Sequence, residues 1–256
     1  KPSFVNLHIE TGLANSISLL HNASDGGTSI VLSAGNKDIR ELAQDRTDLT
    51  EMVRPFTKWT AEVTHPDQFP SVMRRAFNEA KTPPTGPTFV GFSANALDGQ
   101  ADVEIIPSPR GYFRVAPDSR AIESATRILS TASSPTMIVS DRVAESGATA
   151  KAVRVAEMLG ARVYAARYSA VNFPTSHPQF MGTVRLGFPR SRELLSSADV
   201  VLMVGKLASG YYMFSEPPLR FFGPNTKLIH VDSDASDVGK AQPTDVGVIA
   251  DPKVGL

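Results

Sequence analysis

FVNLHIETGLAN, residues 4–15, predicts the end of a strand, a glycine-containing turn and the start of a helix. We expect the strand to cover Ser3–Leu7, the helix to cover Leu13–Ser24, and a second strand to follow at Ser29–Ser33. Parallel strands need a crossover connection, which is usually a helix. The strand–helix–strand order of this stretch therefore predicts an α/β fold with a parallel sheet.

The same alternation continues along the chain but is interrupted once. A helix is expected over His65–Lys81, with Pro66 in its first turn, and a strand is expected over Thr88–Ser93. Residues 95–117 show no periodicity and contain three prolines, which is typical of an interdomain linker.

Short apolar runs and helical patterns alternate again from residue 118 onward. Asp118 is suited to capping a helix that runs to about Ala132, and Gly160 to ending a later helix. The other expected elements are strands over Thr136–Ser140, Val163–Ala166, Val200–Gly205, Lys227–Val231 and Val246–Ala250, and a helix over Arg190–Ala198. The chain is thus predicted to form two doubly wound parallel-sheet domains, residues 1–94 and 118–256, joined by a proline-containing linker over residues 95–117.

The composition excludes several classes of protein. The 26 basic and 26 acidic residues cancel, which argues against a nucleic-acid or anionic-membrane partner bound through bulk charge. The longest apolar runs, such as Val200–Gly205, are far too short to span a bilayer. Cysteine is absent, which excludes thiol catalysis, cysteine-ligated zinc and iron–sulfur clusters. We expect a cytoplasmic protein without nucleic-acid or membrane partners.

His8 lies where the first expected strand ends, and ligands of open α/β sheets bind at the carboxyl ends of strands. Its imidazole could exchange protons near neutral pH, and Gly12 would allow the backbone to approach a flat cofactor ring. A loop histidine in a plain strand–helix turn explains the same pattern and is favoured by the pattern alone. The phosphate-binding patterns GxGxxG and GxxxxGK[ST] are absent.

A second candidate is Leu228–Asp234, an apolar strand that ends in carboxylates. In doubly wound folds a carboxylate at this position binds a ribose hydroxyl, so Asp232 and Asp234 are candidate nucleotide contacts. The same carboxylates are suited to capping the turn around Asp237–Lys240. Capping is favoured, because the glycine fingerprint of a dinucleotide-binding first strand is absent.

Two loops carry further candidates. His177 lies between two prolines in Phe173–Pro178, where it could line a cleft, but hydrogen bonding that ties the loop down is favoured. Tyr212 belongs to the aromatic cluster Gly210–Phe214, which could wall an apolar substrate pocket or form ordinary core.

Several chemical signatures are missing from the sequence. No pair of carboxylates has a compelling spacing, and neither a His-x-x-x-His pattern nor a Gly-x-Ser-x-Gly nucleophile elbow occurs. We therefore assign no metal ligands within the chain, and motifs alone leave its chemistry open.

The order of several segments resembles the thiamin-diphosphate enzymes, in particular benzoylformate decarboxylase and its acetolactate-synthase-like relatives. The segments similar to the pyrimidine-binding domain of this family are Pro2–His8, Gly12–Asn15, Ser29–Gly35, Arg54–Trp59 and Gly86–Val90. Those similar to its central domain are Phe173–Pro178, Ala198–Gly205 and His230–Asp234. The resemblance covers nearly the whole chain, and it rests on order and spacing rather than on any single motif.

This resemblance implies that the chain is part of a larger enzyme. In the family, a glutamate upstream of the position of Lys1 activates the cofactor, and a third domain downstream holds the diphosphate and Mg²⁺. The chain would then contain most of the pyrimidine-binding domain and nearly all of the central domain. Thiamin diphosphate and Mg²⁺ would be cofactors of the whole enzyme, and the segment alone is expected to be inactive.

The resemblance also implies roles for individual residues. His8 matches the active-site histidine of the benzoylformate decarboxylase type, which moves protons during the reaction of a 2-oxo acid. Gly12 and Asn15 match the turn and helix start beside the pyrimidine of the cofactor. Tyr212 stands where benzoylformate decarboxylase has a second histidine, and a tyrosine, with a reference pKa of about 10, relays protons poorly near neutral pH. This departure favours a 2-oxo acid other than benzoylformate, or a carboligation.

The activity implied by the resemblance is the decarboxylation of a 2-oxo acid by a homodimer or homotetramer with active sites between subunits. One alternative is an acetolactate-synthase-like carboligase, in which FAD against the central domain could meet Asp232 and Asp234. Another is a nucleotide-binding module without catalysis, which the fold alone would allow.

Overall fold

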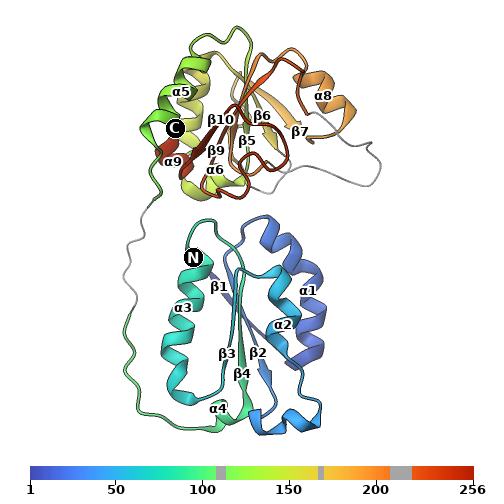
Figure 1. Ribbon diagram of the computed structural model, residues 1–256, viewed down its shortest axis with the longest axis vertical. Helices are drawn as coiled ribbons and strands as arrows, with labels where there is room; N and C mark the ends of the chain where they lie inside the picture. The colour runs from blue at the N-terminus through green and yellow to red at the C-terminus, as the bar shows by residue number, and fades with distance from the viewer. Residues whose placement is uncertain (108–113, 167–169, 208–220) are drawn as a thin grey trace. The chain divides into compact units, whose positions relative to one another are not determined.

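The computed structural model describes residues 1–107, 114–166, 170–207 and 221–256. It divides into two compact units, Lys1–Tyr112 (unit 1) and Phe113–Leu256 (unit 2). Each unit is built around one sheet in which all neighbouring strands run parallel (Figure 1). The prediction of two doubly wound α/β sheets is confirmed.

Unit 1 has a four-stranded sheet in the order β1-β2-β4-β3. Its strands are β1 (Ser3–Leu7), β2 (Ile30–Asn36), β3 (Trp59–Val63) and β4 (Thr88–Ser93). Its helices are α1 (Ile9–Asp25), α2 (Leu49–Val53), α3 (Phe69–Lys81) and α4 (Ala94–Asp98), with 3-10 turns at Ile39–Gln44, Arg54–Phe56 and Pro66–Gln68. Helices α1 and α2 cover one face and α3 covers the other, so each face has its own apolar cluster (Figure 1).

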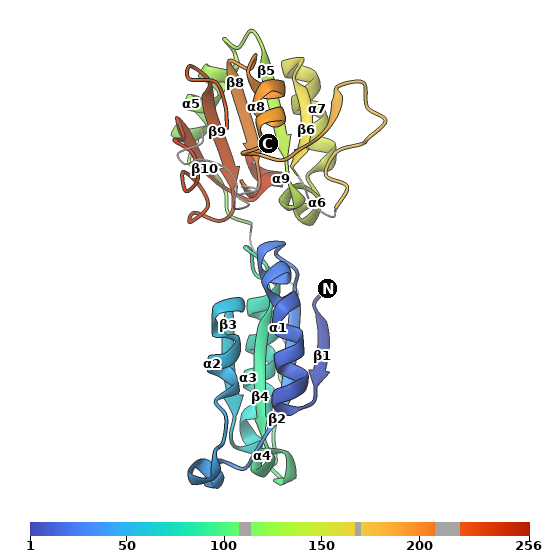
Figure 2. The same cartoon turned by 90° about the vertical axis from the view of Figure 1, so that its right-hand side faces the viewer.

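Unit 2 has a six-stranded sheet in the order β10-β9-β8-β5-β6-β7. Its strands are β5 (Pro135–Val139), β6 (Arg162–Ala166), β7 (Phe180–Val184), β8 (Val200–Val204), β9 (Lys227–Asp232) and β10 (Val246–Ile249). Its helices are α5 (Ser119–Leu129), α6 (Asp141–Ser146), α7 (Thr149–Leu159), α8 (Pro189–Leu195) and α9 (Pro252–Gly255). Figure 2 shows α8 in front of the sheet, whereas α5 and α7 contribute to the apolar cluster of the other face.

The central strands follow directly from the sequence. All five residues of β8 are buried, as expected for a parallel strand that is covered on both faces. The helix ends also follow the expected chemistry: the Asp118 carboxylate accepts a hydrogen bond from the backbone N–H of Arg120 at 2.7 Å, and Gly160 ends α7 with a φ of +61°. Within the ranges that the structure describes, no helix is long and apolar enough to cross a membrane.

Two expectations are corrected by the structure. The helix expected from Leu13 begins at Ile9, so the predicted glycine-containing turn is the first turn of α1. The backbone N–H of Gly12 donates a helical hydrogen bond to the His8 carbonyl at 2.8 Å. Glycine disfavours a helix by only about 1 kcal/mol relative to alanine, and packing of the buried Leu13 and Leu20 outweighs that cost.

The second correction concerns the sheet edges. Strands β3 and β7 were not expected, and both lie at the edge of their sheets. An edge strand is only partly covered, so it does not need a continuous apolar run; β7 contains exposed and half-buried residues in alternation.

Asp199, immediately before β8, joins this strand to the segment that precedes β5. Its carboxylate accepts hydrogen bonds from the backbone N–H groups of Ser133 at 2.6 Å and Ser134 at 2.9 Å. Partial burial alone would raise the pKa of Asp199, but these hydrogen bonds outweigh burial and lower the pKa.

The change Asp199→Asn should therefore destabilise unit 2 by about 1 kcal/mol at neutral pH, because an amide accepts these hydrogen bonds less strongly than a carboxylate. A carboxyl group whose pKa is lowered on folding stabilises the native state above its unfolded pKa, and this stabilisation is lost as the pH falls through the native pKa. The difference between wild type and variant should shrink at acidic pH in urea denaturation followed by circular dichroism. A difference that is independent of pH would contradict this account.

Candidate functional site

His8 follows the last residue of β1 and precedes α1, a position where a side chain commonly caps a helix. The His8 side chain makes no capping hydrogen bond, and the residue is exposed. The next residue, Ile9, has a φ of +26°, which is rare for a β-branched residue. Such backbone strain clusters at functional sites. The imidazole is therefore available to a ligand at the carboxyl edge of the sheet.

Helix α1 places His8, Gly12 and Asn15 along one face, because they are separated by four and three positions. Asn15 is exposed. The three residues that the resemblance assigns to the cofactor region thus lie together on the first two turns of one helix.

Gly12 lies between the other two residues of this face. A Cβ added at Gly12 would lie 3.4 Å from the Cβ of His8 and 3.7 Å from the nearest atoms of Leu7. These are ordinary contact distances, so unit 1 itself does not require glycine at this position. Because glycine has no side chain, the backbone at Gly12 forms the surface between His8 and Asn15.

A second candidate site lies in unit 2 at the carboxyl ends of β5, β8 and β9. In the strand order of the sheet, β6 and β7 lie on one side of β5, and β8, β9 and β10 lie on the other side. Such a reversal opens a crevice at the carboxyl ends of the strands, where α/β proteins bind ligands.

Gly205, which follows β8, brings the loops at this crevice close together. Its φ is +89°, and an added Cβ would lie 2.3 Å from Ser140 Oγ and 2.7 Å from Arg142 Cβ. Both distances are shorter than any tolerable contact, so only glycine fits.

Arg142 and Asp232 face each other across the same crevice. Arg142 Nε lies 3.7 Å from Asp232 Oδ1, beyond hydrogen-bonding distance. Among the described residues, neither Arg142 Nε nor Asp232 Oδ2 has a hydrogen-bond partner, although both atoms are buried. Burial raises the pKa of Asp232, opposed by the hydrogen bond from the Asp234 N–H and by the charge of Arg142. These polar groups are suited to binding a polar ligand.

Glu145 on α6 adds a second carboxyl group, on a residue that is exposed at the surface. Partial burial raises the pKa of Glu145, although Arg142 Nη1 lies 3.4 Å from its Oε2 and opposes the shift. Sequence reasoning missed Arg142 and Glu145; the available signal was their place directly after the strand expected at Thr136–Ser140.

The capping role of the two carboxylates after β9 is confirmed. Asp232 Oδ1 accepts a hydrogen bond from the Asp234 N–H at 2.8 Å, and Asp234 Oδ1 accepts one from the Ser236 N–H at 2.9 Å. Partial burial would raise the pKa of Asp234, but the hydrogen bonds from Ser236 lower it. The turn that follows covers residues 235–240 and includes the expected turn around Asp237–Lys240.

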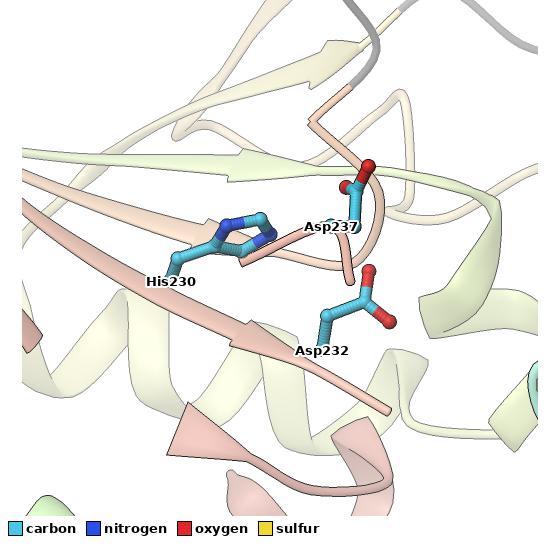
Figure 3. Close-up of side chains that lie close together, drawn as sticks. All are labelled: His230, Asp232 and Asp237. Carbon is cyan, nitrogen blue, oxygen red and sulfur yellow. The ribbon is translucent and has the colours of Figure 1, made fainter. Parts of the chain in front are cut away.

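His230 and Asp237 were also missed as site residues. Side chains in a strand alternate between its two faces, so His230 and Asp232 of β9 lie on the same face. The turn that follows β9 places Asp237 close to both residues (Figure 3). The three residues are buried, and one ligand atom from each lies within 4.8 Å of the others. The two-residue spacing of His230 and Asp232 was the signal that could have found this cluster.

His177 has the structural role that was favoured. Its ring packs edge-on against Phe173 with centroids 5.2 Å apart, and its Nδ1 accepts a hydrogen bond from the Gln179 N–H at 3.3 Å. These contacts hold the loop before β7. Tyr212 lies outside the described residues.

Comparison with known proteins identifies the family. The model of the central domain of thiamine pyrophosphate enzymes matches residues 122–256, more than half of the chain. The chain belongs to this family. The solved structure of benzoylformate decarboxylase from Polynucleobacter necessarius is similar over 100% of this chain, with a TM-score of 0.87 and 26% sequence identity. It matches both α/β units.

Sequence relatives have several different activities. The chain is 26% identical to benzoylformate decarboxylase of Pseudomonas aeruginosa and 29% identical to sulfoacetaldehyde acetyltransferase of Castellaniella defragrans, over 98% and 90% of its length. It is 24% identical, over 94% of its length, to a Methanocaldococcus jannaschii protein described as an acetolactate synthase large subunit. The matches span 49%, 37% and 42% of these relatives, so the chain corresponds to less than half of each.

Proposed function

We propose that the enzyme to which this chain contributes uses thiamin diphosphate to decarboxylate a 2-oxo acid, with His8 as a proton-transfer residue. The observation that carries the proposal is the placement of His8: exposed, without a capping hydrogen bond, and beside the strained Ile9 at the carboxyl end of β1. A capping histidine would make a hydrogen bond to the helix N-terminus, and a core histidine would be buried.

The residues on this face of α1 fit the cofactor. Gly12 presents backbone without a side chain, next to the exposed His8 and Asn15. We assign these three residues to the surface that meets thiamin diphosphate, whereas Mg²⁺ and the diphosphate would be held outside this chain. Bound thiamin diphosphate would supply the sink for the electron pair left when CO₂ departs. A homodimer or homotetramer would complete the site.

The part of His8 in this chemistry is proton transfer. An imidazole changes its protonation state near neutral pH, so one ring nitrogen can give a proton to the reacting substrate and recover it later. His8 lies directly between β1 and α1, and these two elements fix the position of its backbone.

The proposal is tested with the full-length protein, thiamin diphosphate and Mg²⁺. CO₂ release is measured from a panel of aromatic and aliphatic 2-oxo acids, with a control that lacks the cofactor. Cofactor-dependent release is expected from at least one acid. Because the joining of two 2-oxo acid molecules also releases one CO₂, the aldehyde product is measured as well. Absence of CO₂ release while the cofactor is bound would refute decarboxylation, and CO₂ release without aldehyde would favour carboligation.

Gly12 offers an independent prediction. Gly12→Ala should leave unit 1 as stable as the wild type or up to about 1 kcal/mol more stable, because the Cβ fits and alanine favours the helix. The same change should weaken thiamin diphosphate binding by at least about tenfold, since the methyl group occupies the open surface. Stability is followed by fluorescence of Trp59, the single tryptophan, and affinity by cofactor titration of the full-length enzyme. Unchanged cofactor affinity would remove Gly12 from the cofactor contact.

A second candidate function is acetolactate-synthase-like carboligation with FAD. It is favoured by the relatives with that activity and by Arg142 and Asp232, which offer a cation and an unpartnered carboxylate oxygen at the crevice of unit 2. A cation suits a phosphate, and a carboxylate suits a ribose hydroxyl. A flavin absorbance spectrum of the purified full-length protein, together with product formation from two 2-oxo acid molecules, would support this version.

A further inference from the structure

His230, Asp232 and Asp237 form a buried cluster after β8 and β9 that the proposed decarboxylation does not use. The three residues are 0%, 0% and 4% exposed. One ligand atom from each lies within 4.8 Å of the others, and Figure 3 shows the side chains gathered around one small region. An imidazole and two carboxylates are the groups with which proteins bind divalent cations.

The two carboxylates of the cluster are oriented by hydrogen bonds from the backbone. Asp232 Oδ1 accepts one from the Asp234 N–H at 2.8 Å, and Asp237 Oδ2 accepts one from the Leu207 N–H at 2.7 Å. Hydrogen bonds that fix the ligating side chains are a regular feature of metal sites. The cluster is therefore preorganised by the loops that follow β8 and β9.

Among the described residues, both carboxylates of the cluster have an ion-pair partner, but Asp232 is incompletely hydrogen-bonded. Asp232 Oδ2 has no hydrogen-bond partner among the described residues, and an unpartnered buried carboxylate oxygen is costly. Arg142 Nε lies 3.7 Å from Asp232 Oδ1 without a hydrogen bond. Lys240 Nζ lies 3.9 Å from Asp237 Oδ1, and its side chain is 66% exposed, so water screens this pair. A cation would give Asp232 Oδ2 the partner that it lacks.

The distances agree with cation coordination. Bonds of about 2.1 Å in an octahedral site separate adjacent ligands by about 3 Å and opposite ligands by about 4.2 Å. His230 Nε2 and the Gly205 carbonyl oxygen are 2.9 Å apart and hydrogen-bonded without an ion; adjacent ligands of one cation have the same separation, so a bound cation would replace this hydrogen bond. Side-chain atoms within 4.8 Å of one another need only small movements to close around an ion. The Gly205 carbonyl is thus suited to be a fourth ligand.

We propose that His230, Asp232 and Asp237, with the carbonyl oxygen of Gly205, bind a divalent transition-metal cation such as Mn²⁺. The mixture of imidazole nitrogen and oxygen ligands favours such an ion over Mg²⁺, which prefers oxygen ligands alone. The cation ties the end of β8 to the turn after β9. Motif searches miss this site because its ligands follow strand spacing and include a backbone atom.

The test is a titration of the 256-residue chain, dialysed against a chelator, with Mn²⁺. Electron paramagnetic resonance measures the free ion, and one Mn²⁺ per chain is expected to bind. His230→Gln and Asp237→Asn should each weaken binding at least about tenfold. The matched controls are His177→Gln and Asp118→Asn, which alter a histidine and a carboxylate of unit 2 outside the cluster and should leave Mn²⁺ binding unchanged.

Circular dichroism shows whether each variant folds. If a variant does not fold, the proposal is tested by Mn²⁺ binding to the wild-type chain alone. A folded wild type that binds no Mn²⁺ at about 1 mM, a concentration that would reveal even weak specific binding, overturns the proposal. Equal weakening by His177→Gln and His230→Gln also overturns it. An equal concentration of Mg²⁺ should displace little Mn²⁺, and complete displacement would point to an oxygen-only site elsewhere and refute the assignment.

Discussion

Replacing His8 by alanine should lower the turnover number of the full-length enzyme about a hundred-fold or more, the usual contribution of a general acid–base residue. The change removes the only titratable group at this position, whereas the backbone of α1 keeps its hydrogen bonds because the His8 side chain caps none of them. We therefore expect unchanged stability and nearly unchanged cofactor affinity. The loss should fall on kcat, because proton transfer acts in the transition state.

His21→Ala is the matched control for this prediction. His21 is also exposed and also belongs to α1, but it lies 13 positions further along the helix. Its replacement should leave turnover within the error of the assay. The pH profile adds a second readout: the limb that reports an ionising imidazole should disappear in His8→Ala and persist in His21→Ala. Equal turnover of wild type and His8→Ala would exclude His8 from the mechanism.

Burial explains why the central strands were predicted well. β8 is a continuous apolar run, because central parallel strands are covered on both faces, and β9 is buried after its first residue although it contains His230 and Asp232. β1 was also placed correctly, although most of its residues are exposed. The edge strands β3 and β7 lack that constraint. WTAEV in β3 alternates apolar and polar residues, a strand signal that was overlooked, whereas FMGTV in β7 is interrupted by Gly182. The beginning of α1 was placed too late because the unusual φ of Ile9 lets the helix start immediately after β1.

The two candidate sites differ in how far the sequence could reveal them. His8, Gly12 and Asn15 lie within eight consecutive residues. The short segment alone pointed to His8 and Gly12, and the resemblance to the family added Asn15. The crevice of unit 2 is formed by β5, β8 and β9. β5 and β8 are neighbours in the sheet although they are far apart in the sequence, so their proximity is known only from the strand order. Arg142 could be joined to Asp232 only after that order was known.

Gly205 shows most clearly how this crevice depends on one backbone position. Its N–H donates to the Val231 carbonyl at 2.7 Å, and its carbonyl oxygen lies 2.9 Å from His230 Nε2, so the residue links β8 to β9. On the other side, the position of a Cβ at 205 is occupied by Ser140 Oγ and the Arg142 side chain, which follow β5. A side chain at this position must therefore displace the loop after β5.

Gly205→Ala should lower the free energy of unfolding of unit 2 by about 2–5 kcal/mol, the sum of an unfavourable positive φ and of overpacking against Ser140 and Arg142. Gly160→Ala separates the two causes, since Gly160 also has a positive φ, +61°, but a Cβ there meets no atom within 4 Å. We expect that control to cost only about 1–2 kcal/mol.

The free energy of unfolding of both variants is measured by urea denaturation of the 256-residue chain, followed by circular dichroism. The fluorescence of Trp59 reports the unfolding of unit 1 and serves as the reference. Unit 1 is suited to this purpose because its apolar clusters share no residue with those of unit 2. Losses of equal size in the two variants would mean that the loop after β5 yields freely. The close approach of β5, β8 and β9 would then not depend on a glycine at position 205. A clearly larger loss in Gly205→Ala would establish that this contact fixes the geometry in which Arg142, Asp232 and His230 meet.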